Sequence, residues 1–560
     1  MLMKVLVLDA DSAAGLETVQ SLGRKGCAVH TASLRPEYSR HRSRFILSQF
    51  HLANSDDGGI HELVRLFRAE NYDLVVPVTE VALRAMLSPE IPDEMYQRAV
   101  LPPRSKVQTA LDKQAVWDLA RRVGVRVPSG ELVSAESRPP ERFPVVLKPV
   151  FSKLSTSGVV QDFRVTIARD LNQWRTAIAS TYRGVSVQQQ EYIAGKGLGV
   201  EMLFEHGKPR WIFLHERVHE LPLTGGGSSY RVSLDRLDDL VPSATLLLSS
   251  LEWHGVAMAE FKLTASGEVY LMEINPRLWG SLALAIDCGV NFPVGLLCLS
   301  TGQPLPPQPN YRIGYFTRNI YRDIEWFKTN LKADHSDPLL LTKPIISSAF
   351  EWLRPLAGKE SWDFFCWSDL GVILGELRVL AREHWIRVAN LLKRRSHRLY
   401  LTHIQQPRML RELKGWQIDK VLVLCHGNIC RSPLAAALAT KRFPNASFSS
   451  AGFYPKAGRS SPGFVQTAAE QLGVNLAEHR SQCVDARMID DAQLILIMDI
   501  RNYESLKKGY PHALEKTLFL GMLLPKQQLQ IKDPYDAPNS MPAVASKMDS
   551  AIARLSRLLQ

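Results

Sequence analysis

The chain has 560 residues, of which 45% are hydrophobic and 22% are charged, a composition typical of a globular protein with about three or four domains. Its formal net charge of +12 favours anionic partners such as nucleotides, phosphorylated substrates, nucleic acid or anionic membranes. The seven scattered cysteines match neither a disulfide framework nor a paired CxxC zinc pattern, and we find no signal peptide or membrane-length apolar run. We therefore expect a cytoplasmic protein without a transmembrane segment.

Residues 1–104 are predicted to form a small parallel α/β domain. The apolar strand Lys4–Asp9 leads into a helix and a second strand, and a further helix precedes the strand Leu74–Val78. No GxGxxG follows the first strand, which argues against a dinucleotide-binding fold. Polar residues at the strand ends are candidate substrate contacts, although loop polar residues are common there: Asp9, Thr79 and Glu80.

The next segment carries two lysines and a loop rich in small residues. A helical pattern over Ser105–Arg122 contains Lys113, and Lys148 ends an apolar strand, where a buried ammonium group needs an anionic partner. The hydroxyl-rich loop Ser152–Gly158 is typical of loops whose backbone N–H groups fold over phosphates. A strand, a turn region and another strand beginning near Gly197 follow.

The stretch Met258–Ser281 predicts a β-hairpin with an acidic face. If its turn centres between Ser266 and Gly267, Glu260 lies opposite Glu273, and Asn275 shares their face. Opposed carboxylates repel each other unless a cation lies between them, and two carboxylates with an amide oxygen suit Mg²⁺ that carries phosphates. The alternative is a solvated acidic strand face.

The order of these elements over about residues 1–310 resembles the ATP-grasp superfamily, most specifically in the sequence EFK…MEINPR. The resemblance implies an α/β multidomain fold with a pre-ATP-grasp α/β domain (1–104) and an ATP-grasp α+β domain (105–310). It also implies ATP and Mg²⁺ as cofactors, with Mn²⁺ as the other candidate metal. The implied ATP-binding residues are Lys113, Lys148, Ser155, Ser157, Gly158, Gln190, Glu191, Tyr192 and Ile193. The implied metal ligands are Glu260, Glu273 and Asn275, and Arg277 would steady the transferring phosphoryl group or the acyl phosphate.

The substrate region is less defined. Arg217, His219, the glycine-rich loop around Gly226, and Arg231 are candidate contacts for an acidic substrate, because an arginine fork matches a carboxylate. The loop is equally consistent with a flexible surface segment.

Residues 311–418 are predicted to be a basic helical connector, part of which is a candidate to complete the ligase. A helical pattern over Leu370–Lys393 carries one apolar stripe. The segment from Arg378 to Lys414 contains ten basic residues and two acidic residues, which gives it a net charge of +8. The stripe members are Ile373, Leu377, Leu380, His384, Val388 and Leu391. We favour a helix whose stripe packs on a neighbouring domain, and the alternative is binding to anionic lipid or nucleic acid.

A second chemical centre begins at the strand that ends in Cys425. The loop after this cysteine leads into Ser432-Pro433, with Ser432 near the N-cap and Pro433 at the first helical position. The loop amides and the helix N-terminus therefore point at one spot, which binds an anion and favours a Cys425 thiolate, while Arg431 offers a planar fork to phosphate oxygens. The alternative is a buried core thiol.

Over about residues 418–560 the chain resembles the low-molecular-weight protein tyrosine phosphatases, with further matches at HRS (479–481) and DPY (533–535). The resemblance implies a separate doubly wound α/β phosphatase domain (419–560) with a parallel sheet. In it Cys425 would attack phosphorus, Arg431 would bind the phosphoryl group, Ser432 would steady the thiolate, and Asp533 would be general acid and base. The implied phosphate loop is His426, Gly427, Asn428, Ile429 and Cys430, supported by His479.

Three residues refine this resemblance. Cys430 is either a partner for a reversible disulfide with Cys425 or an apolar loop filler. Ile429 is similar to the tyrosine-type loop and not to the phosphoarginine type. Arsenate reduction, which uses two downstream cysteines in related enzymes, is disfavoured because only Cys483 follows.

We therefore expect a bifunctional cytoplasmic enzyme, a Mg-ATP-dependent carboxylate–amine ligase joined to a cysteine-dependent phosphatase. Its expected partners are small carboxylates and amines, and a phosphorylated protein or small phosphomonoester. No specific nucleic acid is expected. One alternative is a phosphatase regulated by a nucleotide-sensing, non-catalytic ATP-grasp half. Another is a tyrosine phosphatase recruited to an anionic membrane, acting on a polysaccharide-export kinase by fold-level analogy.

Overall fold

The computed structural model describes residues 2–35, 43–52, 57–134, 136–150, 153–156, 159–162, 165–182, 184–235, 237, 239–363, 365–366 and 368–559. The chain forms two compact units, Met1–Ala381 and Arg382–Gln560. Helix α13 (Leu370–Tyr400) contains the point where the first unit ends and the second begins.

Unit 1 opens with a four-stranded parallel sheet in the order β3-β2-β1-β4, which confirms the predicted α/β opening. Its strands are β1 (Lys4–Leu8), β2 (Ala28–Ser33), β3 (Ile46–His51) and β4 (Leu74–Pro77). Its helices are α1 (Ala13–Arg24), α2 (Asp57–Glu70), α3 (Glu80–Met86) and α4 (Asp93–Arg98). Buried apolar side chains alternate between the two faces of β1, so one face packs toward α1 and the other toward α2 to α4.

A second, antiparallel sheet follows in the order β5-β10-β6-β9, with the separate pair β7–β8. Its strands are β5 (Gly130–Val133), β6 (Val145–Pro149), β9 (Thr166–Ala168) and β10 (Val187–Glu191), and the pair is β7 (Lys153–Thr156) and β8 (Val159–Asp162). The predicted helix over 105–122 is in fact two helices, α5 (Arg104–Leu111) and α6 (Lys113–Arg122). The helical conformation is interrupted at Asp112, whose backbone is extended. Its carboxylate caps α6 by accepting hydrogen bonds from the backbone N–H groups of Gln114 and Ala115. Helix α7 (Leu171–Thr176) covers this sheet.

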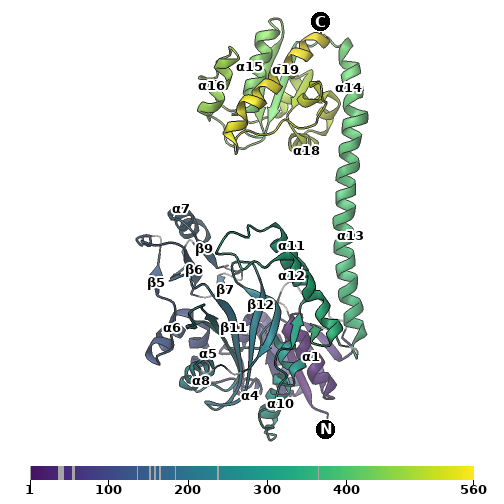
Figure 1. The fold of residues 1–560 in the computed structure, drawn as a ribbon. Coiled ribbons are helices and arrows are strands. Elements are labelled where there is room, and N and C mark those ends of the chain that lie inside the picture. The colour runs from purple at the N-terminus through teal and green to yellow at the C-terminus, as the bar shows by residue number, and fades with distance from the viewer. Residues whose placement is uncertain are drawn as a thin grey trace. The chain divides into compact units, whose positions relative to one another are not determined.

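The largest sheet has seven strands in the order β15-β14-β11-β12-β13-β16-β17. These are β11 (Lys196–Glu205), β12 (Lys208–Leu221), β13 (Gly227–Leu234), β14 (Gly255–Leu263), β15 (Val269–Asn275), β16 (Phe316–Arg318) and β17 (Glu360–Trp362). The helices of this part are α8 (Leu240–Ser250), α9 (Leu282–Cys288), α10 (Phe292–Thr301), α11 (Ile320–Lys332) and α12 (Ile345–Phe350). Figure 1 shows the long strands β11 and β12 at the centre of this unit.

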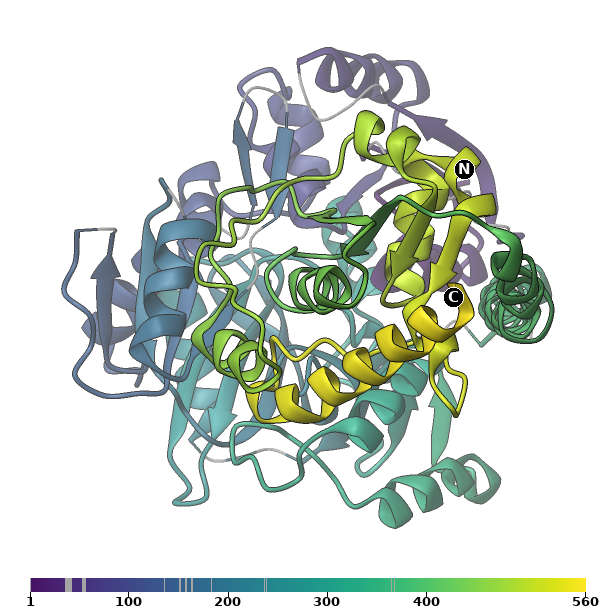
Figure 2. The same ribbon diagram turned by 90° about the horizontal axis from the view of Figure 1, so that it is seen from above.

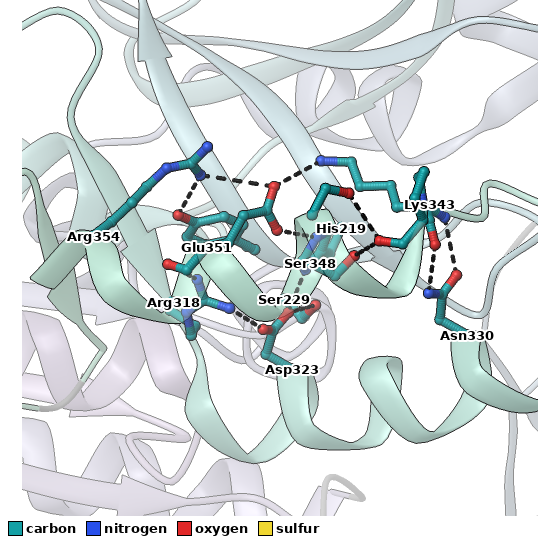
Figure 3. A network of polar contacts seen from close by, with 12 residues as sticks. His219, Ser229, Arg318, Asp323, Asn330, Lys343, Ser348, Glu351 and Arg354 are labelled. Atoms are coloured by element: carbon teal, nitrogen blue, oxygen red, sulfur yellow. Dashed lines mark hydrogen bonds and ion pairs between the residues drawn. The ribbon is translucent and has the colours of Figure 1, made fainter.

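Residues beyond 310 are part of this sheet, because β16 pairs with β13 and β17 pairs with β16. A buried polar network fastens them (Figure 3). His219 of β12 lies 2.8 Å from Asp323 and 2.9 Å from Glu351, and its ring stacks on Trp326 at 3.4 Å. Arg318 pairs with Asp323 and, at 2.7 Å, with Glu360. The sheet therefore takes strands from both sides of the predicted boundary at 310, and the division into four domains remains a proposal.

The acidic hairpin forms as β14 and β15, and Glu260 lies opposite Glu273 as predicted. The predicted turn centre is wrong by half a residue, because a bulge after Glu260 shifts the pairing, so that Phe261 faces Leu271 and Leu263 faces Val269. The connection contains Gly267 at φ +85°, a conformation that glycine adopts without strain.

Helix α13 extends seven residues beyond the predicted end, to Tyr400, and Figure 2 looks along it. Of the predicted apolar stripe, Ile373 is buried but Leu377 is 54% exposed. The side chains of Leu380, His384, Val388 and Leu391 lie outside the described residues. The expectation that the whole stripe packs on a neighbouring domain is therefore wrong at Leu377.

Unit 2 contains a parallel sheet in the order β19-β18-β20-β21, as expected for the doubly wound fold. Its strands are β18 (Lys420–Cys425), β19 (Ser447–Gly452), β20 (Leu494–Ile497) and β21 (Thr517–Phe519). Its helices are α14 (Gln406–Glu412), α15 (Arg431–Arg442), α16 (Gly463–Gln471), α17 (Ala486–Asp491), α18 (Ile500–Gly509) and α19 (Met541–Leu559). Helix α19 contacts both α15 and α16, whereas α14 contacts β21, and one apolar core joins the layers.

Within the part of the chain that the structure describes, no single helix has the length and apolar character to cross a membrane, and α9 with α10 meet that test only as a pair bent by 86°.

Candidate functional sites

A cavity of about 650 Å³ in unit 1 gathers about half of the predicted ligase residues. It is lined by side chains of the acidic hairpin, by Lys113 at the start of α6, and by Thr79 and Glu80 at the end of β4. Of the other predicted residues it contains Arg217, Gly226, Arg231 and Arg277. The predicted strand-end residue Asp9 is buried and accepts a hydrogen bond from Thr79, so its role is to hold that loop.

The acidic face of the hairpin is held by its neighbours. Asn275 Nδ2 donates to Glu260 at 2.8 Å and to Glu273 at 3.3 Å, and the Arg217 guanidinium lies 2.5 Å from Glu260. Arg277 donates to Asn275 Oδ1 at 3.3 Å. The positive charge of Arg217 and the N–H groups of the Asn275 amide thus offset the repulsion between the two opposed carboxylates.

The two carboxylates respond differently to this setting. Burial raises the pKa of Glu260 above its ordinary value, against the lowering effect of Arg217. Burial also acts to raise the pKa of Glu273, but the charges of Lys113, Lys148 and Arg217 lower it overall. Burial lowers the pKa of Lys148, with Glu273 opposing that change. The positive charges of Lys113 and Lys148 thus act on Glu273 more than on Glu260, and the same charges attract phosphate oxygens.

The predicted adenine-binding segment lies at the end of β10. Gln190 is buried, and among the described residues no group accepts a hydrogen bond from its Nε2. The Glu191 carboxylate accepts from the Ser129 backbone N–H at 2.7 Å, and the Ile193 carbonyl accepts from Lys262 at 3.0 Å. Lys262 also lies 5.2 Å from the Tyr192 ring centroid.

These residues fit a magnesium nucleotide. Glu260 and Glu273 present two carboxylates on one half-buried face, Asn275 adds an amide, and the unsatisfied Nε2 of Gln190 suits an acceptor nitrogen of a purine. Within the described ranges no group of three or more His, Cys, Asp or Glu side chains could hold a metal, so such an ion would depend on this mixed donor set. The predicted Ser157 and Gly158, and the side chain of Ser155, lie outside the described residues.

The predicted substrate residues have unequal surroundings. Arg217 donates to the Gly226 carbonyl at 3.1 Å, and although burial acts to lower its pKa, Glu260 and Glu220 raise it. Arg231 is buried and pairs with Asp363, so its charge is already balanced. His219 belongs to the buried network and does not line the cavity.

Two cavity residues and a neighbouring glycine were not identified from the sequence. Arg322 of α11 donates to the carbonyls of Leu221 and Gly227. His215 also lines the cavity, and its Nδ1 lies 3.0 Å from the fully buried Glu201. A Cβ on Gly199 would come within 2.1 Å of the His215 ring. This glycine is therefore a local signal in the sequence that a ring packs against β11 at this position.

In unit 2 the loop after β18 wraps around the Cys425 sulfur. The backbone N–H of Asn428 donates to Sγ at 3.2 Å, and Ser432 Oγ–H donates to it at 3.0 Å. Asn428 adopts φ +50°, and its Nδ2 donates to Ser432 Oγ at 3.0 Å and to Ser450 Oγ at 2.9 Å. Two donors therefore point at the sulfur, an arrangement that stabilises a thiolate.

The start of α15 differs from the prediction. The helix begins at Arg431, with Cys430 as N-cap, so Ser432 is the second residue of the helix and Pro433 the third. Ser432 does not cap the helix because its hydroxyl turns inward to Cys425. Arg431 is buried, and its guanidinium donates to Asp499 at 2.7 Å, to Asp533 at 2.5 Å and to the Ile531 carbonyl at 2.9 Å.

The remaining predicted loop residues surround this centre. His479 Nε2 lies 2.8 Å from the Asn428 carbonyl oxygen. Ile429 and Cys430 are buried, and burial raises the pKa of Cys430 to about 12, with Asp533 and Cys425 adding to the effect. At the rim, Arg459 donates to the Gly427 carbonyl at 2.6 Å and covers the Tyr454 ring at 4.4 Å, and the His426 ring lies 5.8 Å from that of Tyr454. Arg459 was not identified from the sequence, which gives no local signal for it.

Comparison with known proteins separates the same two regions. Residues 420–560 match the family described as low molecular weight phosphotyrosine protein phosphatase, and residues 188–319 match the family described as ATP-grasp in the biosynthetic pathway with Ter operon. The low molecular weight protein-tyrosine-phosphatase Ptp of Acinetobacter johnsonii is 34% identical over 119 residues, which are 21% of this chain and 82% of that protein.

Two further relatives are similar to different parts of the chain. The protein-arginine-phosphatase of Geobacillus stearothermophilus is 30% identical over 143 residues, or 25% of this chain and 96% of that protein. The solved L-amino acid ligase from Bacillus licheniformis overlays on 55% of this chain and 77% of its own, with 15% identity and a TM-score of 0.43. Through residues 420–560 the chain belongs to the low molecular weight phosphotyrosine protein phosphatase family, and its residues 188–319 match the ATP-grasp family model.

Proposed function

We propose that the chain is a bifunctional enzyme whose N-terminal half joins a carboxylate to an amine at the expense of ATP. The observation that carries this proposal is the half-buried pair Glu260 and Glu273 in one cavity with Lys113, with the charge of Lys148 acting on Glu273. When bound, Mg-ATP supplies the phosphoryl group that activates the carboxylate as an acyl phosphate.

The chain's own residues would divide the work around that group. Lys113 and Lys148 would hold the phosphates, and Gln190 to Ile193 would line the adenine. Glu260, Glu273 and Asn275 would hold the metal, with Mg²⁺ preferred to Mn²⁺ as the proposed ion. Arg277 would orient the transferring group, and Arg217 with the Gly226 loop would position the acidic substrate.

For unit 2 we propose hydrolysis of phosphomonoesters of the phosphotyrosine type. Cys425 Sγ would attack phosphorus while Arg431 and the loop amides hold the phosphoryl oxygens, and Asp533 would protonate the leaving oxygen and then accept a proton from water. The contacts of Cys425 Sγ with Asn428 and Ser432 support this assignment. The exposed rings of Tyr454 and Tyr535 are suited to contact an aryl group.

The phosphatase assignment is tested with p-nitrophenyl phosphate and phenyl phosphate. We expect Cys425→Ser to abolish both activities, and Asp533→Asn to slow phenyl phosphate more, because its poorer leaving group needs the proton. Full activity of Cys425→Ser would refute the assignment.

The ligase assignment is tested in the full-length Cys425→Ser variant, which removes phosphatase turnover. We expect ADP formation from Mg-ATP to require both an acid and an amine, and to be lost in the further variant Glu273→Gln. If no mixture of acids and amines yields ADP, while nucleotide addition to the wild-type protein alters phosphatase turnover, the ATP-grasp half is a sensor and the ligase proposal fails.

A further inference from the structure

A basic groove runs between the C-terminal part of α13 and helix α18, both within unit 2. It encloses about 1900 Å³. One wall carries Lys393, Arg395 and Arg398, and the other carries Arg501, Lys507 and Lys508. We refer to it as the α13–α18 groove.

The charge of this groove is unbalanced. Among its lining residues the single acid is Glu504, which lies 3.8 Å from His397 of the opposite wall. Across the described parts of the chain, no carboxylate oxygen lies within 4.0 Å of any of the six lysine and arginine side chains. Six cations that share one concave surface create a positive potential that attracts an anionic ligand.

The groove adjoins the phosphatase centre. Asp499, which pairs with Arg431 at 2.7 Å, is the N-cap of α18, and the groove residues Ile500 and Arg501 follow it directly. Gln530 also lines the groove and precedes Ile531, whose carbonyl accepts from Arg431 at 2.9 Å. One end of the groove therefore lies beside the residues that hold the phosphate-binding guanidinium.

One wall of the groove is a feature of this chain. Lys393, Arg395 and Arg398 precede residue 420, where the match to the phosphatase family begins. The segment predicted as a connector thus adds a basic surface to the phosphatase unit.

We propose that the α13–α18 groove binds an acidic polypeptide segment next to the phosphorylated residue of a protein substrate. The proposal rests on the proposed phosphatase function of unit 2. An extended chain can lie within this groove, whereas a planar bilayer would contact only its rim, and this shape favours a peptide over a membrane. Helix α18 has ten residues, or about 15 Å, which an extended peptide spans with about five residues. The groove therefore selects glutamate or aspartate within about five positions of the phosphotyrosine.

The test compares two phosphotyrosine peptides of equal length, one with five flanking glutamates and one with five glutamines, and uses p-nitrophenyl phosphate as a substrate without flanks. We expect the full-length protein to prefer the glutamate peptide by about tenfold in kcat/KM at low salt, mostly through KM, with the preference falling as salt rises. The triple variant Lys393→Gln/Arg395→Gln/Arg398→Gln should lose the preference and keep its p-nitrophenyl phosphate activity.

The matched control removes the same charge elsewhere in unit 2, as Lys420→Gln/Lys526→Gln/Lys547→Gln, whose three lysines are exposed and do not line the groove. It should retain the preference. Equal rates for the two wild-type peptides, or an equal loss of preference in both triple variants, would overturn the proposal.

Two binding measurements distinguish a peptide-binding groove from a membrane-binding surface. Binding of the fluorescent glutamate peptide to Cys425→Ser does not need turnover, so loss of this binding in the groove variant supports the groove even if the phosphatase function fails. Binding to phosphatidylserine vesicles is measured in parallel. If the groove variant loses vesicle binding and keeps its peptide preference, the groove is a membrane surface and the peptide proposal is wrong.

Discussion

Ser432→Ala is the change whose effect on the phosphatase can best be worked out from the structure. Ser432 is fully buried, and its Oγ–H donates to Cys425 Sγ at 3.0 Å. A hydrogen bond to a charged group contributes about 1.5–3 kcal/mol, and a factor of ten in rate corresponds to about 1.4 kcal/mol. If Ser432 donates this hydrogen bond to the Cys425 thiolate in the transition state, loss of the bond lowers kcat by about 10- to 150-fold.

The same change has a smaller effect on the fold. Asn428 Nδ2 loses one acceptor but keeps Ser450 Oγ at 2.9 Å, so the loop retains its shape. We expect the free energy of unfolding of unit 2 to fall by only about 1–2 kcal/mol.

The assay measures kcat for p-nitrophenyl phosphate and the rate of Cys425 alkylation by iodoacetamide at about pH 7, because both need the thiolate. Both rates should fall in Ser432→Ala. Ser447→Ala, which removes an exposed hydroxyl at the start of β19, is the control and should leave both unchanged. A kcat within twofold of wild type, in a variant that is folded, would refute the role assigned to Ser432.

Three other predictions concern single side chains. Burial, Asp533 and Cys425 raise the pKa of Cys430 to about 12, so its thiol stays protonated at about pH 8. After treatment with iodoacetamide, peptide mass spectrometry should therefore find the label on Cys425 and not on Cys430. Equal labelling of the two cysteines would contradict this. Arg318→Met leaves the buried carboxylates of Asp323 and Glu360 without their cation. The free energy of unfolding of unit 1, measured by urea titration, should fall by about 3–5 kcal/mol. A fall below about 1 kcal/mol would show that the network rearranges to satisfy both carboxylates. Gly199→Ala brings a Cβ within 2.1 Å of the His215 ring and should lower the unfolding free energy of the same unit by about 1–3 kcal/mol, whereas a neutral effect would mean that the ring moves freely.

Local patterns in the sequence predict much of this structure. The facing of Glu260 and Glu273 was predicted correctly because the bulge between this pair and the turn offsets the half-residue error in the predicted turn centre. The Cys425 loop was recognisable because its strand, its small residues and its helix start are contiguous. The helix start at Ser432 was misjudged, since the cap position depends on where the hydroxyl points in three dimensions.

Features that depend on distant contacts were not predictable. Strands β16 and β17 are three residues each, and they are strands only because β13 offers an edge for pairing. Arg322 and His215 enter the cavity through long-range packing and carry no motif. The role of α13 in the basic groove is similarly invisible in its own sequence, because the facing wall, α18, lies far along the chain at Ile500–Gly509.

A trapping experiment asks whether this chain, which carries a phosphatase unit, also forms an acyl phosphate. Hydroxylamine replaces the unknown amine, since it captures acyl phosphates of any acid as hydroxamates. Full-length Cys425→Ser with Mg-ATP, hydroxylamine and a mixture of carboxylic acids should form hydroxamate and ADP in equal amounts, and Cys425→Ser/Glu273→Gln should form neither. Hydroxamate that is absent with every acid, or unchanged by Glu273→Gln, would contradict a working ligase in this chain.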